Sequence, residues 1–169
     1  MKNNPDEVLI IDLEDYTTPK DTQALIEKTG LSDYIYKGPQ GPPWPTLQQM
    51  IDSGGRILLV SEHMTGGASW YRPLNSTIQE TPFDFKTPKE MTCKGGRGDR
   101  DTTLFLLNNW ISTDPTPRPT NARKVNAYNF LLNRARKCER QRHNFPNVLN
   151  VDFYKQGDVF KVVKTLNGG

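Results

Sequence analysis

The sequence predicts an α/β fold, a TIM-like (β/α) barrel of which about half, four βα units, is present. Four apolar runs are nearly continuous, as in strands buried on both faces of a parallel sheet. Helical signals separate the runs, and strands that alternate with helices form right-handed parallel crossover units. A complete barrel needs about 250 residues, whereas the chain has 169.

The predicted strands are rich in Ile, Leu and Val. They cover residues 8–13, 56–60, 103–107 and 148–153. A long excursion over residues 62–101 separates the second strand from the third. Half of a barrel leaves strand edges unpaired, which favours association. We therefore expect either that part of the barrel is missing or that two copies of the chain pair.

Two predicted helices begin at a threonine followed by a proline. Thr18 offers a capping hydroxyl, Pro19 takes the first helical position, and Gly30 lies just beyond the end. Thr87 and Pro88 repeat this arrangement and predict another helix start in the excursion.

A capping box precedes the second strand, because Thr46 and Gln49 can each bond the other's backbone N–H. The longest helix is predicted over residues 121–139, with apolar side chains on one face. We expect its other face to be solvated, although a basic face can also lie on an anionic membrane. That face carries Arg123, Lys124, Arg134, Arg136, Lys137 and Arg140. A final helix is predicted over residues 158–166.

Charge and composition narrow the function classes. A net charge of +3 permits binding to phosphate or an anionic lipid surface, but it is too weak to indicate a nucleic-acid partner. We expect neither a membrane span nor a signal peptide. Cys93 and Cys138 lack zinc-ligand spacing, and they are either two unrelated thiols or one disulfide of an exported protein.

A collinear series of segments carries a resemblance to a known family. The segments are residues 4–8 (NPDEV), 13–16 (LEDY), 29–34 (TGLSDY), 44–47 (WPTL), 50–51 (MI), 56–62 (RILLVSE), 75–85 (NSTIQETPFDF), 104–108 (LFLLN), 125–127 (VNA) and 146–154 (PNVLNVDFY). Over nearly the whole chain, residues 1–169, the series resembles the carboxy-terminal half of a phosphatidylinositol-specific phospholipase C X-type domain. The resemblance implies a TIM-like barrel and phosphodiester cleavage.

The resemblance also implies general acid–base chemistry by two histidines. One activates an inositol hydroxyl and the other protonates the leaving alcohol. Both lie on early strands of the family's barrel, and neither His63 nor His143 lies in a stretch that resembles those strands. We therefore expect the isolated chain to be inactive.

The implied substrate is a phosphoinositide-like lipid or an inositol phosphodiester, and contact with a membrane surface is an expectation. Full-length relatives are often secreted, but the sequence leaves the location of this protein open. A non-enzymatic half-barrel that binds inositol phosphate or lipid headgroups is the alternative function.

Asp152 is the predicted catalytic residue. Barrel chemistry lies at the carboxyl ends of strands, and the resemblance places here an aspartate that hydrogen-bonds the general-base histidine. Alternation along the strand puts Asp152 on a polar face with Asn150 and Tyr154. The alternative is that Asp152 caps the following helix, a role that suits Asp158 better. The same criterion, a position at the carboxyl end of a strand, selects Asp12, Glu14, Asp15, Glu62, His63, Asn108 and Asn109.

Glu14, Glu62 and Trp70 are predicted to contact the substrate. Glu14 resembles a position near the phosphoryl site, where calcium-dependent relatives place a metal ligand. Calcium takes six to eight oxygen ligands, so one carboxylate makes no site, and we expect no metal and no cofactor. Trp70 either lines a headgroup pocket, rests at a lipid interface, or belongs to the core.

Overall fold

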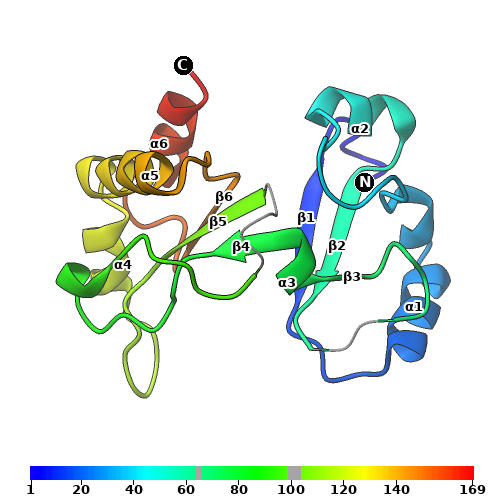
Figure 1. The fold of residues 1–169 in the computed structure, drawn as a ribbon, viewed down its shortest axis with the longest axis horizontal. Coiled ribbons are helices and arrows are strands. Elements are labelled where there is room, and N and C mark those ends of the chain that lie inside the picture. The colour runs from blue at the N-terminus through cyan, green and yellow to red at the C-terminus, as the bar shows by residue number, and fades with distance from the viewer. Residues whose placement is uncertain (64–65, 99–103) are drawn as a thin grey trace. The chain divides into compact units, whose positions relative to one another are not determined.

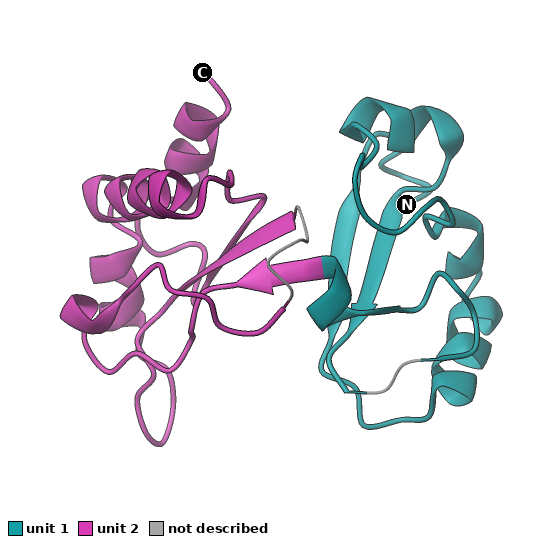
Figure 2. Ribbon diagram, in the orientation of Figure 1, with its two compact units in different colours: residues 1–77 teal, residues 78–169 magenta. Residues whose placement is uncertain are grey.

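The structure is a computed structural model that describes residues 1–63, 66–98 and 104–169. It contains parallel strands and helices joined by loops (Figure 1). The chain divides into two compact units, residues 1–77 and 78–169 (Figure 2). Each unit contains a three-stranded parallel sheet. The predicted α/β class is therefore confirmed, while closure of these sheets into part of a barrel stays a prediction.

In unit 1, Ile26 of the first helix packs against Ile57 and Leu59 of the sheet β1-β2-β3. Its elements are β1 (Leu9–Leu13), α1 (Pro19–Lys28), a 3-10 turn (Leu31–Tyr34), α2 (Leu47–Ser53), β2 (Ile57–Ser61), β3 (Arg72–Pro73) and α3 (Leu74–Thr77). In the register, Leu13 pairs with Ser61 and Val60 pairs with Arg72. The strand β2 is buried throughout, as predicted. The edge strand β1 is not, since its exposure alternates and Ile10 is 42% exposed.

The predicted capping signals of unit 1 are confirmed. The Thr18 side chain accepts a hydrogen bond from the backbone N of Asp21 at 3.2 Å. At the start of α2, the Gln49 backbone N donates to the Thr46 hydroxyl at 3.1 Å, and the Thr46 backbone N donates to Gln49 Oε1 at 2.8 Å. These bonds satisfy N–H groups that have no partner inside the helix.

Replacement of Thr46 tests the capping box. Thr46→Ala leaves the Gln49 N–H without its acceptor, so we expect the free energy of unfolding to fall by about 1 kcal/mol. Urea denaturation measures this loss, and Thr46→Ser is the matched control because serine retains the hydroxyl. Equal stability of Thr46→Ala and Thr46→Ser would show that the capping box is not stabilising.

Unit 2 contains the sheet β4-β5-β6. Its elements are β4 (Ile78–Glu80), a 3-10 turn (Pro88–Glu90), β5 (Leu104–Asn109), α4 (Pro119–Val125), α5 (Tyr128–Arg142), β6 (Val148–Val151) and α6 (Val159–Leu166). Phe105 and Leu107 of β5 pack against Ala135 and Cys138 of α5. This face of the sheet is the helix side, and the intervening residues of each strand belong to the opposite face.

A disulfide joins Cys93 to Cys138, with 5.0 Å between their Cα atoms. Both residues are buried in the cluster between β5 and α5. Of the two alternatives that the sequence left open, the disulfide is therefore the correct one.

The predicted helix over residues 121–139 is wrong in its continuity. It is divided into α4 and α5 at Asn126 and Ala127, and Ala127 has an extended ψ of 140°. The break has a tertiary cause, since the buried Asn126 side chain donates to the carbonyls of Asp152 at 3.0 Å and Gln156 at 3.2 Å. These contacts lie outside the local pattern from which the helix was predicted.

Arg134 does not belong to the predicted solvated face, because it is only 6% exposed. Its guanidinium donates to the carbonyls of Thr92 and Asn108, both at 3.1 Å, and lies over the Phe85 ring at 5.4 Å. Burial lowers the Arg134 pKa to about 10. A long arginine on the polar stripe of α5 thus connects this helix to β5.

Three further details differ from the predictions. The excursion over residues 62–101 contains the strands β3 and β4, which were not predicted. Its capping signal at Thr87 precedes a 3-10 turn instead of an α-helix, and the Thr87 hydroxyl donates to Glu90 Oε1 at 2.9 Å. The last strand ends at Val151, two residues early, and Phe153 takes a left-handed φ of 47°. Thr103, the predicted first residue of the third strand, lies outside the described residues.

Candidate active site

A polar row crosses the sheet of unit 2 near the carboxyl ends of its strands. Asn108 of β5 donates from Nδ2 to Glu80 Oε2 at 2.8 Å, and Asn150 of β6 donates to Asn108 Oδ1 at 3.2 Å. Arg97 donates to the other oxygen of the Glu80 carboxylate. Glu80 and Asn108 are buried. Hydrogen bonds of this kind compensate for burial of polar groups and hold the three strands in register.

Asp152 follows β6 directly, so the structure places it at the edge where the sequence predicted catalysis. Its side chain is half-buried. Within the described parts of the chain, no hydrogen bond reaches its carboxylate, and burial raises the Asp152 pKa. The site therefore presents a partly desolvated carboxylate with unused acceptor capacity.

Asn126 fixes the backbone around Asp152. Besides its two bonds to the carbonyls of Asp152 and Gln156, its own carbonyl accepts from Asp158 N at 2.9 Å. Gly157 allows this approach, because a Cβ there would lie 2.7 Å from the Asn126 carbonyl carbon, and its φ is +86°. The loop after β6 is thus anchored by a buried amide.

Asp158, rather than Asp152, is the N-cap residue of α6, although its side chain bonds the start of α5 and not α6. It immediately precedes α6, and its Oδ2 accepts from the backbone N of Tyr128, the first residue of α5, at 3.0 Å. The capping alternative for Asp152 therefore loses its basis.

Histidine is absent from the surroundings of Asp152 in unit 2. His143 ends α5 and lies on the amino side of β6, whereas Asp152 lies on the carboxyl side. The four residues of β6 separate them by roughly 13 Å at 3.3 Å per residue. His143 therefore cannot hydrogen-bond Asp152.

The selected residues of unit 1 gather at the carboxyl ends of β1 and β2. Buried Asp15 accepts from the Ser61 hydroxyl at 2.6 Å, from His63 N at 3.1 Å and from the Tyr71 hydroxyl at 3.0 Å. Burial by itself would raise the Asp15 pKa, but these hydrogen bonds lower it below the ordinary value of 3.8. Asp15 thus joins the ends of two strands.

The Asp15 contacts predict acid-sensitive stability. Because the folded pKa lies below the unfolded value, the carboxylate stabilises the fold above about pH 4, and this contribution is lost as the pH falls through the folded pKa. Asp15→Asn should lower the free energy of unfolding at pH 7 by about 1–3 kcal/mol. Urea denaturation of parent and variant should show this difference shrinking below pH 3.8. A difference that stays constant with pH would contradict the role.

The predicted substrate contacts have different surroundings. Glu14 is exposed and accepts from the Tyr16 hydroxyl at 2.9 Å, and it lines a cavity of about 510 Å³ between β1 and α1. Glu62 follows β2 and is half-buried, with its backbone N donating to Leu13 O at 2.9 Å. Trp70 packs, half-buried, against the core of unit 1, which favours the core alternative.

Metal-binding clusters and membrane-spanning helices are both absent from the described residues. Among residues 1–63, 66–98 and 104–169, no three His, Cys, Asp or Glu side chains lie close enough together to hold a metal ion. No helix in these ranges is both long and apolar enough to cross a bilayer.

Sequence reasoning missed Glu80 and Asn126. Neither residue follows a predicted strand, so the search at the carboxyl ends of predicted strands could not select them. The available signal was their position within the segments NSTIQETPFDF and VNA that carry the family resemblance.

Comparisons with known proteins identify the family of the chain. The PI-PLC X family model, described as PI-PLC X 1, matches residues 1–167. The chain is 28% identical over 155 residues to PI-PLC X domain-containing protein 1 of Arthroderma benhamiae, covering 82% of this chain and 50% of that protein. An uncharacterized secreted protein of the same fungus is 26% identical over 195 aligned positions, covering 99% and 44%.

The chain thus spans about half the length of these curated relatives. No solved structure matches it. Since the family model covers nearly every residue, the chain belongs to the PI-PLC X family.

Proposed function

We propose that this chain forms the carboxy-terminal part of a PI-PLC X-type phosphodiesterase barrel that cleaves a phosphoinositide-like lipid or an inositol phosphodiester. The observation that carries the proposal is Asp152, a half-buried carboxylate at the strand end that accepts no hydrogen bond from the described residues. Such a group suits a partner that arrives from another segment, because an unpaired buried carboxylate is costly.

In the proposed reaction, Asp152 positions a general-base histidine supplied by another segment. The carboxylate accepts from the imidazole N–H, which fixes the tautomer and stabilises the imidazolium that forms. The base removes the proton of an inositol hydroxyl, whose oxygen attacks phosphorus. A second histidine gives its proton to the leaving alcohol as the P–O bond breaks.

The barrel arrangement is supported by the faces of the two sheets. All strand pairs are parallel, and the exposed Ile10 lies on the face of β1 opposite the helix-covered core. In a barrel, this face would be covered by interior side chains.

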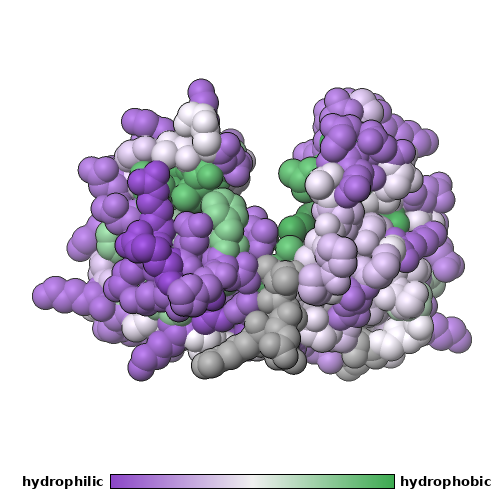
Figure 3. Space-filling model, turned by 45° about the horizontal axis from the view of Figure 1, so that its top comes forward, coloured by the Kyte–Doolittle hydropathy of each residue, from purple (hydrophilic) through white to green (hydrophobic). Residues whose placement is uncertain are grey.

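A contact with the membrane surface is supported by exposed aromatic residues next to Asp152. Phe153, Tyr154 and Phe160 are 44%, 53% and 70% exposed, and Lys155 and Lys161 lie among them. In Figure 3, apolar side chains interrupt the largely hydrophilic surface of unit 2. Aromatic rings beside lysines suit an anionic lipid surface.

A binding module without catalysis is the second candidate. It is favoured by the position of His143, which lies on the wrong side of β6 to serve Asp152. In that case the chain would hold inositol phosphate or lipid headgroups without cleaving them.

Reconstitution distinguishes the two candidates. The chain would be produced alone and together with the amino-terminal PI-PLC X segment of the Arthroderma benhamiae relative, and release of inositol phosphate from phosphatidylinositol vesicles would be measured. We expect no turnover by the chain alone and turnover by the complex. Headgroup binding without turnover in a folded complex would support the binding module. Turnover by the chain alone that is lost in His63→Ala would contradict the proposed origin of the base.

A further inference from the structure

An N-glycosylation sequon lies in α3. Asn75, Ser76 and Thr77 have the pattern Asn-X-Ser/Thr with X other than proline, and no other asparagine of the 169-residue chain begins such a triplet. We propose that Asn75 is an acceptor site for an N-linked oligosaccharide. This inference goes beyond the proposed phosphodiesterase and does not depend on it.

The Asn75 side chain can carry an oligosaccharide without disturbing the fold. It is exposed, and within the described parts of the chain its amide takes part in no hydrogen bond. Asparagine is also a weak helix former, because its side chain competes for backbone hydrogen bonds. Neither burial nor pairing with the described residues therefore accounts for asparagine at this position of α3.

The other two residues of the sequon do have structural contacts. The fully buried Thr77 hydroxyl donates to Pro73 O at 2.7 Å, and the Ser76 hydroxyl accepts from Gln40 Nε2 at 2.8 Å. The sequon requires a hydroxyl at Thr77. Because this hydroxyl is buried in the fold, a transferase that recognises it must act before α3 folds.

The proposed modification is a group transfer to Asn75 Nδ2. The donor is a lipid-linked oligosaccharide diphosphate. A bond forms between Nδ2 and the anomeric carbon of the first sugar as the bond from that carbon to the diphosphate oxygen breaks. The amide gives up one proton, the lipid diphosphate leaves with the electron pair of the broken bond, and no oxidant or reductant is needed.

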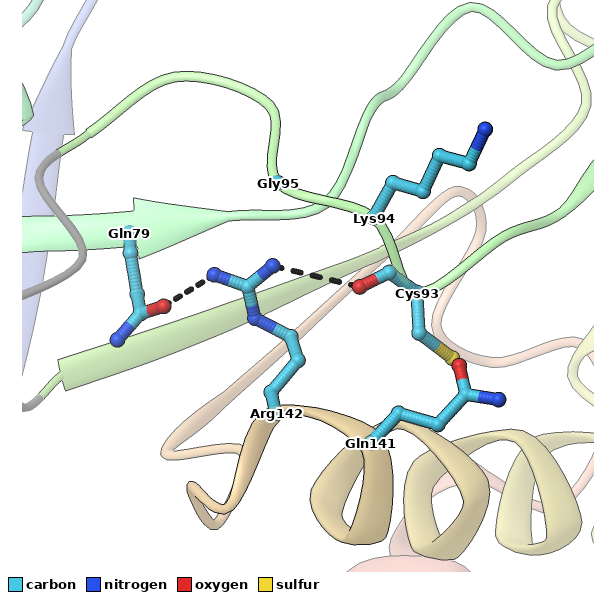
Figure 4. A pocket seen from close by; sticks show the side chains of 6 residues that line it. All are labelled: Gln79, Cys93, Lys94, Gly95, Gln141 and Arg142. Atoms are coloured by element: carbon cyan, nitrogen blue, oxygen red, sulfur yellow. Dashed lines mark hydrogen bonds between the residues drawn. The ribbon is translucent and has the colours of Figure 1, made fainter.

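The disulfide between Cys93 and Cys138 favours passage through the compartment where such a transfer takes place. Disulfides form and persist in the lumen of the endoplasmic reticulum and are rare in cytosolic proteins. The two cysteines are 5% and 0% exposed, and Figure 4 shows the Cys93 side chain directed toward α5, the helix that carries Gln141 and Arg142. The bridge is therefore part of the core of unit 2. Both curated relatives belong to a fungus, a eukaryote that has this compartment.

The acceptor site is remote from the candidate active site. The helix α3 leads directly into Ile78 at the amino end of β4, which pairs with Leu104 of β5. Two residues later, Leu106 pairs with Val148 of β6, which lies four residues before Asp152. The two levels are thus six residues apart, roughly 20 Å at 3.3 Å per residue. We therefore expect loss of the glycan to leave the turnover of the reconstituted domain unchanged.

Export of the full chain from yeast, behind a cleavable signal sequence, tests the acceptor site. Chains from the secretory lumen and from the medium would be compared by electrophoresis before and after treatment with the amidase that removes N-linked glycans. Mass spectrometry would identify the modified residue, because the amidase converts a glycosylated asparagine to aspartate. We expect the treatment to increase the mobility of the parent and to convert Asn75.

Asn75→Gln and Thr77→Ser are the matched variants. Asn75→Gln retains an exposed amide but removes the acceptor, and it should fold normally because Asn75 is exposed. Thr77→Ser retains the hydroxyl and therefore the sequon. We expect an amidase-dependent shift in mobility for Thr77→Ser and none for Asn75→Gln. The proposal is overturned if the oxidised parent carries no glycan, or if Asn75→Gln shifts like the parent.

A second measurement tests the order of transfer and folding. Unglycosylated chain purified from bacteria would be given the transferase and its lipid-linked donor, either folded and oxidised or reduced and unfolded. We expect transfer to Asn75 in the unfolded chain alone, since Thr77 is fully buried in the fold. Equal transfer to the folded chain would contradict the burial argument, and absence of transfer to either form would overturn the acceptor site.

Discussion

Asp152→Asn should reduce the turnover of the reconstituted domain by a hundredfold or more. The amide retains the shape of the side chain but removes the charge that stabilises the imidazolium, and it can orient the wrong tautomer of the base. Initial rates of inositol phosphate release under saturating substrate measure the effect. Folding would be verified by circular dichroism and by assembly of the complex.

Asp158→Asn is the matched control for this experiment. It makes the same chemical change six residues away, where the carboxylate bonds a backbone N–H at the start of α5. We expect it to reduce stability by about 1 kcal/mol while turnover by the folded complex is retained. Unchanged turnover in a folded Asp152→Asn complex would show that Asp152 is only structural.

Removal of the disulfide should have the largest effect on stability. Cys93→Ala combined with Cys138→Ala opens a loop with a sequence separation of 45 residues. In the chain-entropy treatment, this loss lowers the free energy of unfolding by about 4 kcal/mol. Burial of both cysteines adds to it, because the variant leaves space in the cluster between β5 and α5.

Urea denaturation of the oxidised parent and the double variant measures this loss. The reduced parent is the control, since reduction opens the same bridge without changing the sequence. A loss below about 1 kcal/mol in both the variant and the reduced parent would contradict a stabilising bridge.

Local features of the fold could be predicted from the sequence because their causes are local. The capping box at Thr46 and Gln49 needs only two residues three positions apart. The strands β2 and β5 are buried apolar runs, and Phe105 and Leu107 are fully buried as their pattern indicates. These elements were therefore predicted to within about two residues at each end.

Features that depend on distant residues could not be predicted. Helical periodicity continues through Asn126, whereas the hydrogen bonds of its side chain to carbonyls of the loop after β6 accompany the division of the helix there. Arg134 looks like any basic residue on a solvated helix, yet its partners are carbonyls at Thr92 and Asn108. The strands β3 and β4 are too short to form an apolar run.

In the candidate site, too, residues with a local signal could be predicted, whereas residues whose role depends on distant partners could not. Asp152 and Asn108 could be selected from the sequence because each lies at the carboxyl end of an apolar run, where barrel enzymes place their chemistry. Glu80 could not be selected, since β4 was not predicted, although Glu80 accepts from Asn108 in the buried polar row. For Trp70, aromatic character alone could not distinguish a pocket from the core against which it packs.

The pH dependence of kcat/KM for the reconstituted domain shows whether Asp152 acts on the catalytic base. The acidic limb of this profile reports the pKa of the general base in the free enzyme. A carboxylate within hydrogen-bond distance raises a histidine pKa, so we expect Asp152→Asn to move the limb to lower pH by about one unit, together with the fall in rate. A limb at the same pH in parent and variant would contradict the claim that Asp152 acts on the catalytic base.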